Sequence, residues 1–124
     1  MLKLGISPGK GRGVFAAVPI KAGTVFERCP IIRIPKEEIM HIRRTVLADY
    51  FFTWDREKQD AAIALGFGSL YNHSYRPNAK FDMALEDREV VFTALRDIEA
   101  GEEITVNYNG KPDDMRRLWF ETLP

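Results

Sequence analysis

A mostly β domain is predicted by the sequence, with short strands in small sheets and one or two short helices. Three short stretches are rich in apolar residues and bounded by Gly or Pro, as strands commonly are: residues 13–17, 24–28 and 31–34. Apolar residues alternate with polar or small ones from 81 to 85, and residues 86–88 then form a polar turn into an apolar run at 89–93. This pattern is typical of a β-hairpin.

The first helix is expected to begin after Pro35. Acidic residues come early in this stretch, at positions 37 and 38, and arginines come late, at positions 43 and 44. That order suits the helix dipole, and Pro is favoured at a helix start. The buried face of this helix would be formed by Ile39, Ile42 and Val46.

A second helix is expected near Pro112, where Asp113 and Asp114 come first and two arginines follow. One side of it would be lined by Met115, Leu118, Trp119 and Thr122. Residues 111–124 would then form a C-terminal segment that flanks a single domain spanning residues 1–124.

The chain contains one internal echo. Residues 20–26 and 98–104 each read as a turn that pivots on Ala-Gly and leads into a strand, because Gly permits a positive φ. The spacing is too long for a solenoid. We expect two similar turns at opposite ends of one β fold.

Composition excludes several classes of protein. Eighteen basic residues balance eighteen acidic ones, so there is no net basic field for direct nucleic-acid binding. Cys29 is the only cysteine, so an intrachain disulfide and a Cys-rich zinc cluster are not expected. Apolar runs are far shorter than the roughly 20 residues that span a bilayer, and no signal peptide is recognisable. A reduced, cytoplasmic location fits these features.

Three segments stand out as candidates for chemistry. The first is Gly11-Arg12-Gly13, which reads as a tight turn or as a backbone that approaches a ligand closely. The second, residues 71–78, is rich in Asn, His, Ser and Pro, and turn chemistry alone would explain it. The third, residues 101–109, is a strand that ends in Asn-Tyr-Asn, where the Tyr could simply pack at the rim of the core.

Together these segments, in this order, resemble the SET-domain family of protein-lysine N-methyltransferases. The similarity rests on Gly-x-Gly near the start, Asn-His-Ser-x-x-Pro-Asn in the middle and Gly-Glu-Glu-Ile-Thr-x-x-Tyr near the end, and it covers roughly residues 4–108. The resemblance implies a β-clip-like SET fold with a C-terminal pseudoknot. The length is that of a minimal stand-alone SET protein of the bacterial or viral type.

The resemblance also implies roles for individual residues. S-adenosyl-L-methionine is the expected cofactor, and its methionine part would be held by Gly11, Arg12 and Gly13. Asn72 would bind the methionine end and the main chain of His73 the adenine. Tyr108 matches the active-site tyrosine and would also contact the cofactor. Phe81 and, less directly, Tyr50 match aromatic residues of the lysine channel.

Two departures from the family pattern concern closure of the channel. Many relatives carry a zinc ligand where this chain has Tyr75, and further cysteines near the C-terminus. No metal site is expected here, so another element must close the channel. Trp119 and Phe120 are the best candidates, and one of them could stack on the adenine, although both could simply pack the last helix onto the domain.

The predicted activity is transfer of a methyl group from S-adenosyl-L-methionine to a lysine of a protein or peptide, such as a histone or histone-like protein. No membrane partner is expected, and a domain this small could complete its groove as a homodimer. The alternative from another class is a catalytically silent SET-like module that binds a peptide. Such modules usually lack the Asn-His pair or the tyrosine, whereas this chain has both.

Overall fold

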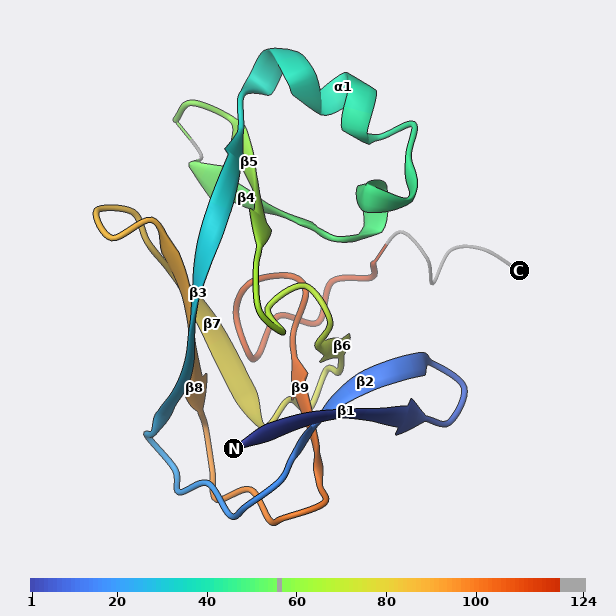
Figure 1. Ribbon diagram of the computed structural model, residues 1–124, viewed down its shortest axis with the longest axis vertical. Coiled ribbons are helices and arrows are strands. Elements are labelled where there is room, and N and C mark those ends of the chain that lie inside the picture. The colour runs from blue at the N-terminus through green and yellow to red at the C-terminus, as the bar shows by residue number, and fades with distance from the viewer. Residues whose placement is uncertain (56, 119–124) are drawn as a thin grey trace.

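The computed structural model of the protein describes residues 1–55 and 57–118 and consists of two small sheets and a short helical segment (Figure 1). The four-stranded sheet contains, in spatial order, β1 (Leu2–Ser7), β2 (Gly11–Ala16), β9 (Glu103–Val106) and β6 (Asn72–His73). The five-stranded sheet contains, in spatial order, β4 (Phe51–Asp55), β5 (Asp60–Ala64), β3 (Val25–Ile34), β8 (Glu89–Ala94) and β7 (Ala79–Ala84). The predicted mostly β class is confirmed.

Strand pairing is antiparallel everywhere except between β6 and β9, which run parallel. The predicted hairpin is confirmed as β7 and β8, and the predicted strand at residues 13–17 is β2. The stretches at 24–28 and 31–34, predicted as two strands, are one strand, β3. Pro30 marks the point where β3 changes partner: residues up to Pro30 pair with β8, and those after it pair with β5.

The helical segment begins where predicted but is shorter than predicted. It consists of a 3₁₀ turn η1 (Lys36–Glu38), the single-turn helix α1 (Ile39–Ile42) and a second 3₁₀ turn η2 (Val46–Asp49). Thr45 interrupts it, because its backbone is extended and its hydroxyl donates to the carbonyl of Ile42 and accepts from the N–H of Leu47. The prediction of a buried face was wrong: none of these residues is buried, and Val46 is 74% exposed.

The second predicted helix is absent from residues 111–118. In this segment the carbonyls of Pro112, Asp114 and Arg116 accept hydrogen bonds from side chains elsewhere in the chain, so they are not used in helical i to i+4 bonds. Met115 is 68% exposed and Leu118 is buried. The rest of the predicted helix, including Trp119 and Thr122, lies outside the described residues.

The two Ala-Gly turns lie side by side and not at opposite ends of the fold. Ile20 and Ile98 exchange both main-chain hydrogen bonds, at 2.8 and 2.7 Å. The flanking bonds repeat on the two sides: Gly23 N donates to the Ala94 carbonyl, and Gly101 N donates in the same way to that of Ala16. Both glycines have a left-handed φ, of 84° and 87°, as the sequence predicted. The local similarity was read correctly, but pairing of remote segments decided where the turns lie.

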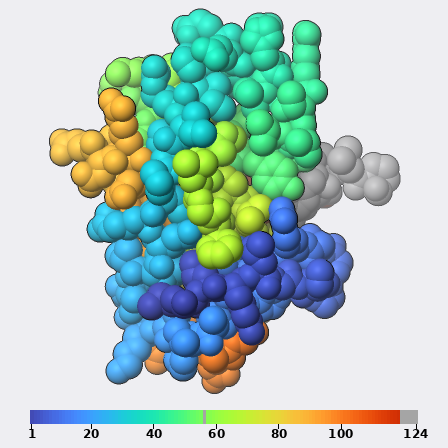
Figure 2. All heavy atoms as spheres, in the orientation of Figure 1, coloured from blue at the N-terminus to red at the C-terminus, as the bar shows by residue number. Residues whose placement is uncertain are grey.

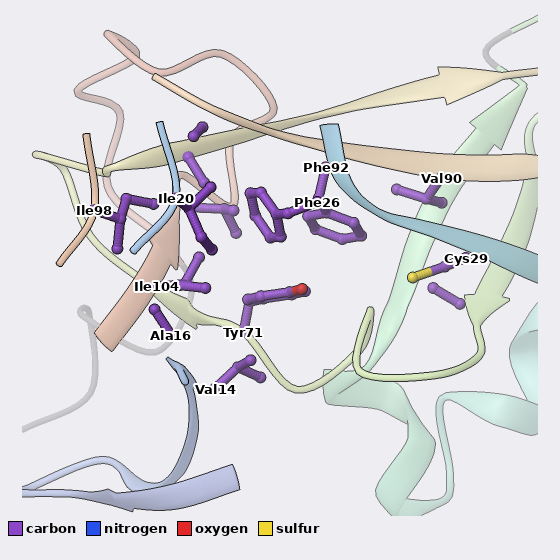
Figure 3. Close-up of a cluster of buried hydrophobic side chains, with 14 of the residues drawn as sticks. Val14, Ala16, Ile20, Phe26, Cys29, Tyr71, Val90, Phe92, Ile98 and Ile104 are labelled. Atoms are coloured by element: carbon purple, nitrogen blue, oxygen red, sulfur yellow. The ribbon is translucent and has the colours of Figure 1, made fainter. Parts of the chain in front are cut away.

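The core lies between the two sheets (Figure 3). Its centre is a cluster of aromatic rings in which Tyr71 packs on Phe92 at 4.5 Å and on Phe26, edge to face, at 6.1 Å between ring centroids. Ile20, Ile98 and Ile104 cover the cluster on one side, and the free thiol of Cys29 lies with Val90 on the other. The segment leading into β6 therefore passes through the centre of the molecule, which fixes its position.

Figure 2 shows the segment after β5, in yellow-green, between the helical segment above and the β1–β2 hairpin below. Among the described residues, no helix has both the length and the apolar character needed to cross a membrane.

Candidate functional site

Tyr108 joins the candidate residues to one another. It follows β9 by two residues, and its N–H donates to Nδ1 of His73 at 3.0 Å. Its hydroxyl donates to the carbonyl of Tyr71 at 2.6 Å. Burial raises the pKa of Tyr108 to about 12, and the nearby Tyr50 hydroxyl and Glu103 carboxylate add to the shift. The phenol is therefore neutral at physiological pH and keeps its hydrogen bond to the Tyr71 carbonyl.

A cluster of polar groups lies on one side of this junction. The Glu103 carboxylate accepts from the Asn72 amide and from the Ser7 hydroxyl, each at 2.7 Å. The same Asn72 amide donates to the carbonyl of Arg12 at 3.1 Å. These bonds connect β1, β2, β6 and β9, so they join all four strands of the smaller sheet at one point.

Gly13 faces this cluster and leaves no space for a side chain. A Cβ at this position would lie 2.5 Å from Oε2 of Glu103 and 2.8 Å from Nδ2 of Asn72. The sequence leaves two interpretations of this glycine, a tight turn or a backbone that approaches a ligand closely. The structure gives a reason within the chain, since the Glu103 and Asn72 side chains fill the space that a Cβ would need.

The main chain of His73 is also engaged. Its carbonyl accepts from Nζ of Lys10 at 2.9 Å, while the side chain is only 8% exposed. Gly11 and Arg12 are both exposed, at the start of β2. The candidate cofactor residues therefore bring together donors from Lys10 and Asn72 and acceptors from the main-chain carbonyls of Arg12 and His73.

A cavity of about 1050 Å³ lies on the other side of the junction. Its lining combines aromatic and acidic residues. The aromatic ones are Tyr50, Phe51, Phe52, Trp54, Tyr71, Phe81 and Tyr108, and the acidic ones are Asp49, Asp55 and Asp82. Phe81 packs edge to face on Phe52 at 5.1 Å, and Tyr50 is 37% exposed at the end of η2. All three predicted channel residues (Tyr50, Phe81 and Tyr108) line this cavity.

The structure thus places the predicted residues in two groups that meet at Tyr108. Gly13, Asn72 and His73 belong to the polar cluster, and Arg12 joins it through its carbonyl. Gly11 is the neighbour of Arg12 in β2, and a Cβ built at Gly11 would meet no atom within 4 Å. Trp119, predicted as a cofactor contact, and Phe120 lie outside the described residues.

Sequence reasoning gave no role to four residues that build the site: Ser7, Lys10, Tyr71 and Glu103. Two of them could have been found, because Tyr71 directly precedes Asn72, and Glu103 lies within the Gly-Glu-Glu-Ile-Thr motif. Ser7 and Lys10 carry no such signal, since only strand pairing brings them to the cluster. Within residues 1–55 and 57–118, no three His, Cys, Asp or Glu side chains are placed to hold a metal ion.

Comparison with known proteins agrees with this arrangement. A family model described as the SET domain matches residues 11–109. The Schizosaccharomyces pombe histone-lysine N-methyltransferase specific for H3 lysine-37 is 38% identical over 113 residues, which are 90% of this chain and 71% of that protein. The rice histone-lysine N-methyltransferase TRX1 is 33% identical over an alignment of 124 positions. This alignment covers 93% of this chain but only 12% of the relative.

Solved structures show the same fold. A candidate histone methyltransferase of Plasmodium falciparum superposes with a TM-score of 0.72 at 29% identity, covering 96% of both chains. The Chaetomium thermophilum Polycomb Repressive Complex 2, in an autoinhibited conformation bound to S-adenosylmethionine, superposes with a TM-score of 0.74 at 26% identity. That match covers 86% of this chain and 15% of the other.

The packing around Gly13 generates the first prediction. Gly13→Ala is expected to lower the free energy of unfolding by about 1–3 kcal/mol, as overpacking of a filled site does. The loss should be smaller in a Glu103→Ala background, because that change removes the nearest atoms. Urea unfolding of the two single variants and the double variant measures this coupling. Equal losses in both backgrounds would show that the glycine is needed for another reason.

Proposed function

We propose roles for the site residues from one premise: this chain belongs to the SET-domain family and is an S-adenosylmethionine-dependent protein-lysine N-methyltransferase. The observation that carries the assignment of roles is the position of Tyr108. Its main chain is bonded to the polar cluster through His73, and its side chain lines the aromatic cavity. A methyl donor on one side and a lysine on the other would therefore meet at its hydroxyl.

The polar cluster fits the cofactor chemically. S-adenosylmethionine supplies the methyl group and, when bound, a positive sulfonium beside a methionine end with an amine and a carboxylate. The Arg12 carbonyl and the Glu103 carboxylate have further lone pairs for a cationic group. The two N–H donors of Asn72 are engaged with these acceptors, and its side-chain oxygen is one more acceptor. The His73 carbonyl and the Lys10 amine offer one acceptor and one donor for a polar ring such as adenine.

The aromatic cavity fits the lysine. A free lysine amine has a pKa near 10.4, so its deprotonation at pH 7 costs about 4.6 kcal/mol. An apolar, aromatic surrounding lowers that pKa because it disfavours the charged form, and so does a nearby positive charge. The rings of Phe52, Trp54 and Phe81 supply the apolar part of this surrounding, whereas the carboxylates of Asp49, Asp55 and Asp82 in the same cavity act in the opposite direction. The positive sulfonium would therefore contribute to deprotonation together with the rings, and the proton can pass to water.

Tyr108 would orient the lysine amine by accepting a hydrogen bond from it. Its hydroxyl proton is already donated to the carbonyl of Tyr71, so the lone pairs of Oη remain for the amine N–H and for weak C–H···O contacts with a polarised methyl group. Burial raises its pKa to about 12, which disfavours the phenolate near neutral pH, so we assign it an orienting role. Holding two reactants in line removes several kcal/mol from a barrier, and this is the contribution we assign to Tyr108.

The substrate proposal goes beyond the family. Both curated relatives are named as histone-lysine methyltransferases, and we propose a histone or histone-like protein as the substrate. We also propose an intracellular location. The cytoplasmic location and the homodimer stay predictions. The absence of direct nucleic-acid binding and the bacterial or viral type stay predictions as well. The single domain with a flanking segment at 111–124 stays a prediction too.

The test is incubation of the protein with labelled S-adenosylmethionine and separate histone, ribosomal and whole-lysate fractions, followed by mass spectrometry of the labelled residue. Label on lysine in the histone fraction is the expected result. Label only in another fraction would contradict the histone proposal while leaving the activity intact.

Asn72→Ala should weaken cofactor binding about tenfold or more, because charge-assisted hydrogen bonds contribute roughly 1.5–3 kcal/mol each. Calorimetric titration with S-adenosylmethionine measures the Kd, and thermal unfolding reports whether the fold survives loss of the bond to Glu103. An unchanged Kd in a folded variant would remove Asn72 from the cofactor site.

Tyr108→Phe should lower kcat on the order of 100-fold, since misplacement of a reacting group by about 1 Å has effects of this size. The cofactor Kd should stay within a few-fold, because the main-chain bond to His73 is kept. Single-turnover transfer to a peptide measures the rate. Near-normal turnover would show that Tyr108 is not the active-site tyrosine.

Phe81 should control the number of methyl groups added. A Phe leaves space near the amine, whereas a Tyr hydroxyl would hold the amine or a water and crowd later transfers. The wild type is expected to form di- or trimethyl-lysine, and Phe81→Tyr to shift the products toward monomethyl-lysine. Mass spectrometry of a peptide after long incubation distinguishes these products. A wild type that stops at monomethyl-lysine, or an unchanged pattern in the variant, would place Phe81 in the core only.

A further inference from the structure

We infer that Asn107, Asn109 and Tyr75 are positioning residues, which fix Tyr108 by binding the carbonyls of the C-terminal segment, residues 111–118. The inference rests on the proposed role of Tyr108. Its starting point is the order of the chain: Tyr108 stands between two asparagines whose side-chain amides both reach forward to this segment.

Asn107 provides the buried half of the attachment. It is 2% exposed, and its amide donates to the Asp114 carbonyl at 2.6 Å and, more weakly, to that of Pro112 at 3.4 Å. Its side-chain oxygen accepts from the N–H of Asn109 at 2.9 Å. Asn107 therefore binds both the C-terminal segment and Asn109, the residue on the other side of Tyr108.

Asn109 and Tyr75 provide the second half, because they bind the same atom. The Asn109 amide donates to the Arg116 carbonyl at 2.7 Å, and the Tyr75 hydroxyl donates to it at 2.9 Å. Two donors from segments far apart in the chain therefore converge on one acceptor. Tyr75 stands at the position where the family resemblance places a zinc ligand in many relatives, so a hydroxyl and a carbonyl join the two segments here.

Tyr75 also connects the attachment to the partner of Tyr108. Its ring meets the His73 ring edge to face at 4.5 Å, and the His73 ring lies 5.2 Å from that of Tyr108. His73 accepts a hydrogen bond from the N–H of Tyr108. The C-terminal segment is therefore connected to Tyr108 through the two sequence neighbours of Tyr108 and through His73. A loosened segment would leave the Tyr71 carbonyl as the main remaining constraint on the hydroxyl.

A segment that merely covers the core would behave differently. Leu118 is 4% exposed, so the segment does bury apolar surface, and its loss would cost stability. If the segment only covers the core, removing a polar attachment should change the melting temperature and the turnover together. Positioning predicts a lower kcat with little change in melting temperature or cofactor affinity.

The experiment compares Tyr75→Phe, Asn109→Ala and the double variant with Met115→Ala, an exposed position of the same segment. Each single variant should lower kcat at saturating cofactor and peptide by roughly threefold to tenfold, the value of one net hydrogen bond. The S-adenosylmethionine Kd should stay within about twofold. Because both bonds end on the Arg116 carbonyl, the double variant should lose clearly less than the product of the two single losses.

Several outcomes would overturn the inference: kcat values equal to that of Met115→Ala, multiplicative losses in the double variant, or losses of kcat that follow the melting temperature. Hydrogen exchange over residues 107–118 must also increase in Tyr75→Phe and Asn109→Ala, and unchanged exchange would contradict the attachment itself. Tyr108→Phe, measured in the same assay, distinguishes failure of the proposed role of Tyr108 from failure of the positioning role. If that variant keeps its turnover, the proposed role of Tyr108 fails; if it loses turnover while the others do not, only the positioning role fails.

Discussion

The parallel pairing of β6 with β9 is the contact on which the site depends. It is only two residues long, with Asn72 opposite Thr105 and His73 opposite Val106. This register places the Asn72 amide beside Glu103, and it puts the residue that follows β9 by two positions next to the His73 ring. A slip of one residue would exchange the faces of the strand and separate the polar cluster from the aromatic cavity.

So short a pairing is stable because buried polar side chains support it. Asn78, which is 2% exposed, accepts from the N–H of Thr105 and donates to the carbonyl of Glu103, so it binds β9 along its length. Tyr71 secures the other strand, since its hydroxyl donates to the Glu27 carboxylate at 2.6 Å within the core. Burial beside this carboxylate raises the pKa of Tyr71, so the hydroxyl keeps its proton and its donor role in alkaline solution.

Sequence patterns predicted the local features and missed those that depend on remote contacts. The β7–β8 hairpin and the two Ala-Gly turns were readable because each is set by neighbouring residues. The helix predicted near Pro112 does not form over residues 111–118, because the side chains of Tyr75, Asn107 and Asn109 bind the carbonyls of this segment. Val46 was placed on a buried face by periodicity, but it is 74% exposed. Ser7 and Lys10 could not be assigned, because only the folded sheet brings them to the site.

The paired turns bear on how the site can move. Two of the connections that cross between the sheets, β2 to β3 and β8 to β9, are bonded to each other through Ile20 and Ile98. A hinge between the sheets would have to bend both connections at once, and their mutual hydrogen bonds oppose this. The polar cluster and the aromatic cavity are therefore preorganised at a fixed separation, so little ordering entropy is lost when ligands bind. The helical segment at 36–49 and residues 111–118 belong to neither sheet, so either can move without bending these two connections.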